Sequence, residues 1–199
     1  GLDACIVFSD ILMIPYASGC DVSFKEGVGP QVKFNERFNF ASHKLDPVIK
    51  GIENIKKASE VPLIGFVGGP WTTLLYCLFD KEERSQMNKG LIHKNEKRIN
   101  THIEDLTDVI SNYATQQVNA GIDAFQIFES AAEDLEDEYF DRWCLKPTQK
   151  IIHSIKSKSD IPVIGFPRKT SKEGYVKYSN IDKLDCISLD YDFDLDHIN

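Results

Sequence analysis

The sequence predicts an α/β protein built on a parallel β-sheet. Short apolar runs recur along the chain, and segments with helical periodicity and a charged face separate them. This alternation of strand and helix is typical of parallel strands joined by right-handed crossovers. The runs are almost continuously apolar, which indicates strands buried on both faces. No linker or low-complexity tract divides the 199 residues, so we predict one domain.

Five apolar runs are the predicted strands, and they cover residues 4–8, 63–67, 124–128, 163–166 and 186–189. A Val-Pro or Ile-Pro step precedes the second and the fourth strand, and a residue before proline disfavours helix. A turn at 121–124 ends the helix before the third strand. The predicted helices cover residues 47–60, 91–120, 145–157 and 172–178.

Composition excludes several classes of protein. The chain is 42% hydrophobic and 27% charged, which favours a folded domain over a disordered one. Its longest apolar stretches fall far short of the ~20 residues of a membrane helix. A net charge of −8 argues against a protein that binds nucleic acid by broad phosphate neutralisation. The five cysteines are scattered without a Cys-x-x-Cys pair, which indicates a reducing compartment, and we expect a cytoplasmic protein.

The ends of the chain point to a longer parent protein. Position 1 is Gly rather than Met, and the first strand begins almost at once. Five strand–helix units fill this chain, whereas a closed barrel of eight would need ~250 residues or more. The residues alone therefore leave two alternatives: an open sheet, or a barrel with chain missing at both ends.

Polar side chains follow each predicted strand, where parallel α/β folds gather their functional groups. They are Ser9 and Asp10, residues 68–72, Glu129 and Ser130, residues 167–169, and Asp190. Asp10 is isolated between two apolar runs, and burying a carboxylate there is costly unless N–H donors or a cation pair with it. The alternative is that Asp10 caps the next helix.

Three further candidate residues, Ser130, Glu129 and Tyr76, could also have purely structural roles. Ser130 could cap a helix that begins at residue 131, with Glu129 as part of the same helix start. Pro70 is suited to starting a helix that would present Tyr76, which could instead belong to the core. The glycines at 65–69 lack the spacing of a nucleotide-binding loop, and the histidines lack the spacing of zinc ligands. A Gly-x-Ser-x-Gly elbow is also absent from the sequence.

Three motifs, taken in their order and spacing, closely resemble the uroporphyrinogen decarboxylase family: residues 8–11 (Phe-Ser-Asp-Ile), 65–72 and 127–130 (Ile-Phe-Glu-Ser). Residues 26–30, 165–168 and 189–190 add to the similarity, which runs from end to end of the chain. The resemblance implies an incomplete (β/α)8 TIM barrel with about five βα units. Residues 1–199 would then be the central part of one domain, with N- and C-terminal portions missing.

The resemblance also implies an activity. The family removes carbon dioxide from the four acetate side chains of uroporphyrinogen, giving coproporphyrinogen for haem synthesis, as a homodimer without metal or organic cofactor. Asp10 matches the catalytic aspartate that binds the pyrrole N–H groups. Tyr76 matches the active-site tyrosine, and Ser130 matches a serine that contacts a substrate carboxylate. Phe66 and Phe128 match apolar residues that flank the macrocycle.

Several family features are missing from the chain. An arginine-rich segment near the family's N-terminus and a histidine near its C-terminus have no counterpart, and we expect both outside these 199 residues. The substrate is highly anionic, so we expect the isolated chain to be inactive and poorly folded. Residues 80–84 replace a glycine-rich stretch that commonly follows the tyrosine, and residues 131–133 lack the glycine expected after the serine motif.

Two alternatives to the decarboxylase remain. One is a zinc- and cobalamin-linked methyltransferase of the same barrel superfamily, which would need a His-x-Cys and a later cysteine. The His-x-Cys step does not occur in the sequence. The other is a degenerate barrel without catalysis, kept for binding, and the unusual residues after Tyr76 and Ser130 are its only support.

Overall fold

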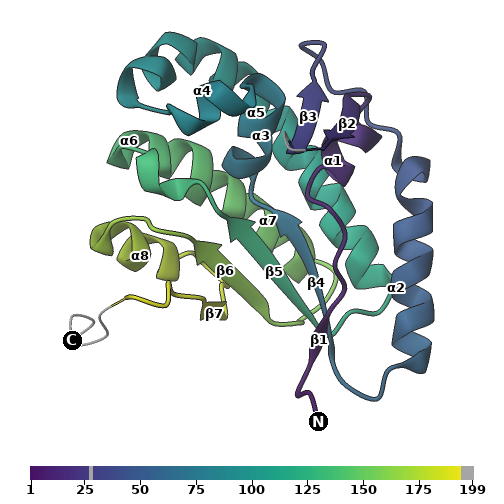
Figure 1. Ribbon diagram of the computed structural model, residues 1–199. Helices are drawn as coiled ribbons and strands as arrows, with labels where there is room; N and C mark the ends of the chain where they lie inside the picture. Colours follow the sequence, from purple (N-terminus) through teal and green to yellow (C-terminus); the bar gives the residue numbers. More distant parts are fainter. Residues whose placement is uncertain (27–28, 194–199) are drawn as a thin grey trace.

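A five-stranded parallel sheet is the centre of the computed structural model, which describes residues 1–26 and 29–193. The strands lie side by side in chain order, as Figure 1 shows: β1 (Cys5–Ile6), β4 (Leu63–Gly68), β5 (Ala124–Glu129), β6 (Val163–Pro167) and β7 (Cys186–Ile187). Every neighbouring pair is parallel. The predicted strands are all present, although the two outer ones are shorter than the sequence predicts.

The predicted helices are also present: α2 (Asp46–Ala58), α3 (Pro70–Leu78), α5 (Lys89–Asn119), α7 (Lys146–Lys156) and α8 (Lys172–Ser179). Helix α5 packs against β4 and α7, α3 contacts β5, and α8 contacts β6 (Figure 1). Sequential parallel strands with helical crossovers are the arrangement of a section of a (β/α)8 barrel. The predicted fold class is therefore confirmed.

The two faces of the sheet differ in burial. In β5, Phe125 and Ile127 are fully buried in the core, whereas Gln126 and Phe128 on the opposite face are half-buried. Strand β6 alternates in the same way. The sequence predicts burial on both faces, and for β5 and β6 this is wrong in the part of the chain that the structure describes. No second layer covers the half-buried face there.

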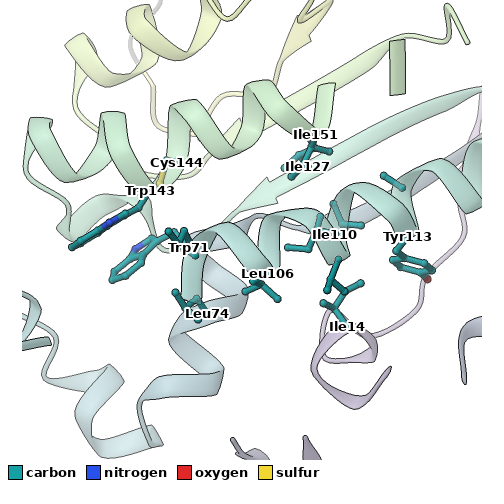
Figure 2. Close-up of a cluster of buried hydrophobic side chains, with 14 of the residues drawn as sticks. Ile14, Trp71, Leu74, Leu106, Ile110, Tyr113, Ile127, Trp143, Cys144 and Ile151 are labelled. Atoms are coloured by element: carbon teal, nitrogen blue, oxygen red, sulfur yellow. The ribbon is translucent and has the colours of Figure 1, made fainter. Parts of the chain in front are cut away.

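A large aromatic and aliphatic core fills the buried side of the sheet. The indole rings of Trp71 and Trp143 are fully buried and stack at 5.3 Å between centroids (Figure 2). Tyr139 stacks on the other side of Trp143 at 4.3 Å. The same buried cluster includes Leu74, Leu106, Ile110, Ile127 and Ile151 (Figure 2). This core fixes the first turn of α3 against the helical stretch that precedes α7.

The structure adds elements that the sequence analysis does not predict: α1 (Met13–Ala17), the antiparallel pair β2 (Asp21–Lys25) and β3 (Gly29–Lys33), η1 (Ser42–Leu45), α4 (Lys81–Ser85), η2 (Ala132–Asp134), α6 (Asp137–Phe140) and the π-helical turn η3 (Asp141–Leu145). Helix α7 therefore continues a helical stretch that begins at α6. The elements between β1 and β4 form a long connection, and Asp10 lies near its start.

That connection is fastened to α5. Glu36 adopts a left-handed backbone conformation, with φ of 55°, and its carboxylate accepts hydrogen bonds from the Arg98 guanidinium. The ring of His102, which is nearly buried, lies 3.1 Å from the same carboxylate. Because an Arg–carboxylate pair of this kind fixes orientation as well as distance, the segment after β3 is held to the helix.

Candidate functional site

Four phenylalanines from neighbouring segments form one aromatic wall on the half-buried face of the sheet. Phe8, just past β1, stacks on Phe66 of β4 with 5.4 Å between ring centroids. Phe66 meets Phe128 of β5 edge-to-face at 5.7 Å, and Phe128 meets Phe166 of β6 in the same way at 6.2 Å. The predicted site residues Phe66 and Phe128 are thus brought into contact. The ring of Phe8 is 80% exposed, so this end of the wall is open to a ligand.

The backbone of Phe66 is held by a side chain from α5. The amide of Gln117 donates to the carbonyl of Phe66 at 2.9 Å and accepts from its N–H at 3.1 Å. A Cβ on the neighbouring Gly65 would lie 2.6 Å from the Gln117 amide oxygen. Glycine at this position therefore lets the amide approach the strand.

Asp10 lies two residues beyond Phe8 and is half-buried. Its Oδ1 accepts the backbone N–H of Leu12 at 2.8 Å, and its carbonyl accepts the N–H of Met13 at 3.0 Å. The carboxylate thus orients the turn that leads into α1, which is close to the alternative interpretation of Asp10 as a helix cap. The following residue, Ile11, lies against Gly68 at the end of β4. Asp10 is therefore at the edge of the sheet where functional groups of such folds gather.

Ser130 lies in the turn that follows β5, two residues after Phe128, and it is half-buried. The alternative role as a helix cap is not found, because η2 begins at Ala132 without a side-chain cap. Its backbone neighbours are both tied to other elements. Ser130 therefore occupies the same edge of the sheet as the aromatic wall, on a turn with a fixed path.

Tyr76 is on α3, which begins at Pro70 as the sequence predicts. Its ring is half-buried and lies under the guanidinium of Arg84, which is 4.2 Å from the ring centroid. Asp80 and Glu83 form a reciprocal capping box that starts α4, and this places Arg84. Among the described residues, the structure does not bring Tyr76 into hydrogen-bond contact with Asp10 or Ser130.

Glu129, the last residue of β5, is fully buried on the side opposite Phe128. Its carboxylate accepts the N–H of Thr72 at 2.6 Å, the N–H of Trp71 at 3.3 Å and the hydroxyl of Thr72. The carboxylate therefore caps the N-terminus of α3, where a negative charge is favoured. Burial raises the pKa of Glu129 to about 7, and the hydrogen bonds from Thr72 and Trp71 oppose this shift.

Asp190 and Lys169, two other candidates at this edge of the sheet, make contacts within the fold. Asp190 accepts the backbone N–H of Lys169 at 2.6 Å and the hydroxyl of Tyr175 at 2.6 Å. The ammonium of Lys169 lies 3.3 Å from Glu133. The cationic residues after β6 are thus exposed and partly paired.

Sequence reasoning did not select Phe8 or Phe166 as site residues, and it placed Glu129 only among the polar residues that follow the strands. The two phenylalanines carry a usable signal, because each stands near the end of a predicted strand, as Phe66 and Phe128 do. The role of Glu129 as a cap of α3 gives no signal in the sequence. Its partners Trp71 and Thr72 are more than fifty positions earlier in the chain, and only the fold brings them to it.

In residues 1–26 and 29–193 we find no group of three or more His, Cys, Asp and Glu side chains that could hold a metal ion. Over the same residues, the helices are too short or too polar to cross a membrane.

A family model described as uroporphyrinogen decarboxylase (URO-D) matches residues 1–199. The chain belongs to the uroporphyrinogen decarboxylase family. This confirms the resemblance found in the three motifs.

Curated members of the family are about one third identical to the chain. The uroporphyrinogen decarboxylase of Wolbachia sp. subsp. Brugia malayi is 35% identical over 199 residues, covering 96% of this chain and 56% of that protein. The uroporphyrinogen decarboxylase of Neorickettsia sennetsu is 36% identical over 205 residues, covering 99% of this chain and 62% of that protein. The uroporphyrinogen decarboxylase of Chelativorans sp. is 33% identical over 202 residues, covering 96% of this chain and 59% of that protein. The chain thus spans about three fifths of the length of these relatives.

Among solved structures, a methyltransferase from Methanosarcina mazei superposes with a TM-score of 0.66. The match covers 95% of this chain and 65% of that chain, at 17% sequence identity. At this identity the similarity shows the fold alone.

Proposed function

We propose that the whole protein carrying this chain removes carbon dioxide from the four acetate side chains of uroporphyrinogen, giving coproporphyrinogen. Family membership supports this function. One structural observation carries it further: the carboxylate of Asp10 lies at the same edge of the sheet as the aromatic wall of Phe8, Phe66 and Phe128. An apolar wall beside a single carboxylate suits a tetrapyrrole, because the wall can contact the pyrrole rings while the carboxylate accepts from the N–H groups at the centre of the macrocycle.

Asp10 would accept hydrogen bonds from the pyrrole N–H groups. When the bond between an acetate carbon and its carboxylate breaks, the electron pair flows into the pyrrole ring, which must be protonated to receive it. The substrate thereby supplies the electron sink that a cofactor usually provides. A fixed carboxylate next to the ring stabilises the positive charge of that protonated state. The N–H of Leu12 holds Oδ1 of Asp10 and so orients the group before substrate binds. A proton then adds to the side-chain carbon, and the ring releases the proton that it had gained, which leaves a methyl group on a restored pyrrole.

The other predicted residues would bind and orient the macrocycle. Phe66 and Phe128 would contact its faces, which their position in the aromatic wall supports. Ser130 would hydrogen-bond a substrate carboxylate from the turn after β5. We assign Tyr76 to the same site from its family match. Because the ring of Tyr76 lies under Arg84, its hydroxyl would reach substrate beside a cation that attracts carboxylates.

We further propose that residues 1–199 are the central part of one barrel domain. The arginines and the histidine of the family would then come from chain outside them. The net charge of −8 would repel an anionic substrate if no further cations joined the site. In this proposal the whole protein is a cytoplasmic homodimer that needs no metal or organic cofactor.

The test is an assay of the whole protein with uroporphyrinogen under anaerobic conditions, with and without a metal chelator. We expect coproporphyrinogen, identified by the mass lost as four carbon dioxide molecules, at the same rate in both. Absence of decarboxylation by a folded protein would refute the proposal. Transfer of a methyl group to a thiol, abolished by the chelator, would favour the methyltransferase instead.

A further inference from the structure

Hydrogen bonds from both sides of Ser130 join the end of β5 to the start of α3. Before it, the carboxylate of Glu129 receives the N–H groups of Trp71 and Thr72 and the hydroxyl of Thr72. After it, the N–H of Ala131 donates to the hydroxyl oxygen of Thr72 at 3.1 Å, and its carbonyl accepts the indole N–H of Trp71 at 2.9 Å. The path of Ser130 is therefore set by α3.

The chain makes room for this arrangement at Gly69. The N–H of Gly69 donates to the carbonyl of Phe128 at 2.7 Å, so the two segments are in direct contact. A Cβ at position 69 would lie only 2.2 Å from a carboxylate oxygen of Glu129. The backbone conformation of Gly69, with φ of −61° and ψ of 156°, is open to any residue. The glycine is thus required by the buried carboxylate and not by the turn.

A buried carboxylate is an expensive way to cap a helix, since a serine or threonine at the cap position would serve. The charge of Glu129 acts on two buried groups, the thiol of Cys144 in η3 and the hydroxyl of Tyr178 in α8. Burial, followed by the charge of Glu129, raises the pKa of the Cys144 thiol. Glu129 has no ion pair with a cation in the described part of the chain. The hydrogen bonds from α3 therefore offset part of the cost of burying its carboxylate, which couples the helix to β5.

We propose that Glu129 is a positioning residue, which fixes Ser130 and the first turn of α3 relative to each other. Tyr76 follows Thr72 by one helical turn, so the contacts that fix the start of α3 also set the position of Tyr76. This inference rests on the proposed function, because it concerns residues assigned to the substrate there. Glu129 itself lies behind the sheet and acts through these residues.

The test measures kcat and KM for uroporphyrinogen in the full-length protein carrying Glu129→Gln, Ser130→Ala or both changes. The amide keeps the size of the side chain but presents N–H donors to the N–H of Trp71. We expect Glu129→Gln to raise KM about tenfold, because the change removes one hydrogen bond to a charged group. We expect the double variant to raise KM by less than the product of the two single effects, since part of the Glu129 effect on binding acts through Ser130. Two outcomes would overturn the inference. One is a KM of the double variant that equals the product of the two single effects, and the other is an unchanged KM in Glu129→Gln.

Thr72 offers a milder pair of variants if Glu129→Gln does not fold. Thr72→Val removes the hydroxyl that links Glu129 to Ala131, and Thr72→Ser keeps it. We expect Thr72→Val to raise KM several-fold more than Thr72→Ser does. Thr107→Val is the matched control, because Thr107 is equally buried but donates only to Ile103 within α5. An equal loss in Thr72→Val and Thr107→Val would contradict a positioning role.

Hydrogen exchange separates failure of this inference from failure of the proposed function. In the same protein, we expect Glu129→Gln to increase exchange at the amides of Trp71, Thr72 and Ala131, with the amides of β6 unchanged. This holds whether or not the unaltered protein decarboxylates uroporphyrinogen. Unchanged protection at those three amides would overturn the inference, even in an active enzyme.

Discussion

The carboxylate of Glu129 accepts the N–H of Thr72 at 2.6 Å, so the last residue of β5 caps α3 from a different part of the chain. Because β5 also leads into Ser130, this contact links the buried side of the sheet to the candidate site. The aromatic wall lies on the other face of the same strand. The carboxylate of Glu129 therefore lies on one face of β5, and the phenylalanines proposed to bind substrate lie on the other face.

The first prediction concerns pH and stability. Burial raises the pKa of Glu129 in the folded chain from 4.5 to about 7, so between these values the folded state binds more protons than the unfolded state. The contribution to stability is fully present below pH 4.5 and is lost as pH rises toward 7. Its full size is about 3 kcal/mol. Urea unfolding between pH 4.5 and 8 measures it.

Glu129→Gln is the control, because the amide does not titrate. The variant should lack this part of the pH dependence, although its stability at any one pH also reflects the altered hydrogen bonds. The neighbouring Cys144 and Tyr178 have raised pKa values and stay neutral over this range. An identical slope in the two proteins would show that Glu129 does not titrate there.

The second prediction concerns the space at Gly69. Gly69→Ala places a Cβ 2.2 Å from the carboxylate of Glu129, and the buried side chain can move little. We expect the free energy of unfolding to fall by about 1–3 kcal/mol. Gly51→Ala in α2 is the matched control, since no atom lies within 4 Å of its Cβ. That change should be neutral or stabilising by up to ~1 kcal/mol. Equal stabilities of the two variants would contradict the packing described.

The third prediction separates binding from stability at the open end of the wall. Phe8 is 80% exposed, so Phe8→Ala should change the free energy of unfolding by less than about 1 kcal/mol. In the full-length protein it should weaken substrate binding about fivefold, because the ring offers an aromatic face beside Phe66. KM for uroporphyrinogen and thermal unfolding measure the two effects. Phe24→Ala, at 65% exposure on β2, is the control and should leave KM unchanged.

The sheet could be predicted from sequence because each middle strand is a compact apolar run with a Pro or Gly turn before it. The start of α3 could be predicted from Pro70, whose missing N–H costs nothing at that position. The pair β2 and β3 could not, since its strands carry polar residues, include Gly29 and Pro30, and pair only with each other. The π-helical turn η3 has no signal in helical periodicity, because it interrupts that period.

The site divides in the same way. Asp10 and Ser130 could be chosen as candidates from their places after strands, and Phe66 and Phe128 from the family motifs. The contact of Arg84 with Tyr76 could not be predicted, because residues 80–84 depart from the family there and form a helix of their own. The carboxylate of Asp10 orients a turn with one oxygen, as in the cap-like interpretation, and its role toward substrate stays a prediction.

The most direct test of the account is Asp10→Asn in the full-length protein, assayed for coproporphyrinogen. The amide oxygen can still accept the N–H of Leu12, so the turn into α1 should persist, but the negative charge is lost. We predict that kcat falls by about 100-fold or more, with unchanged thermal unfolding. Asp160→Asn, which removes an exposed carboxylate between α7 and β6, should leave kcat unchanged. Full turnover by Asp10→Asn would contradict the central claim that this carboxylate stabilises the charge formed on the substrate.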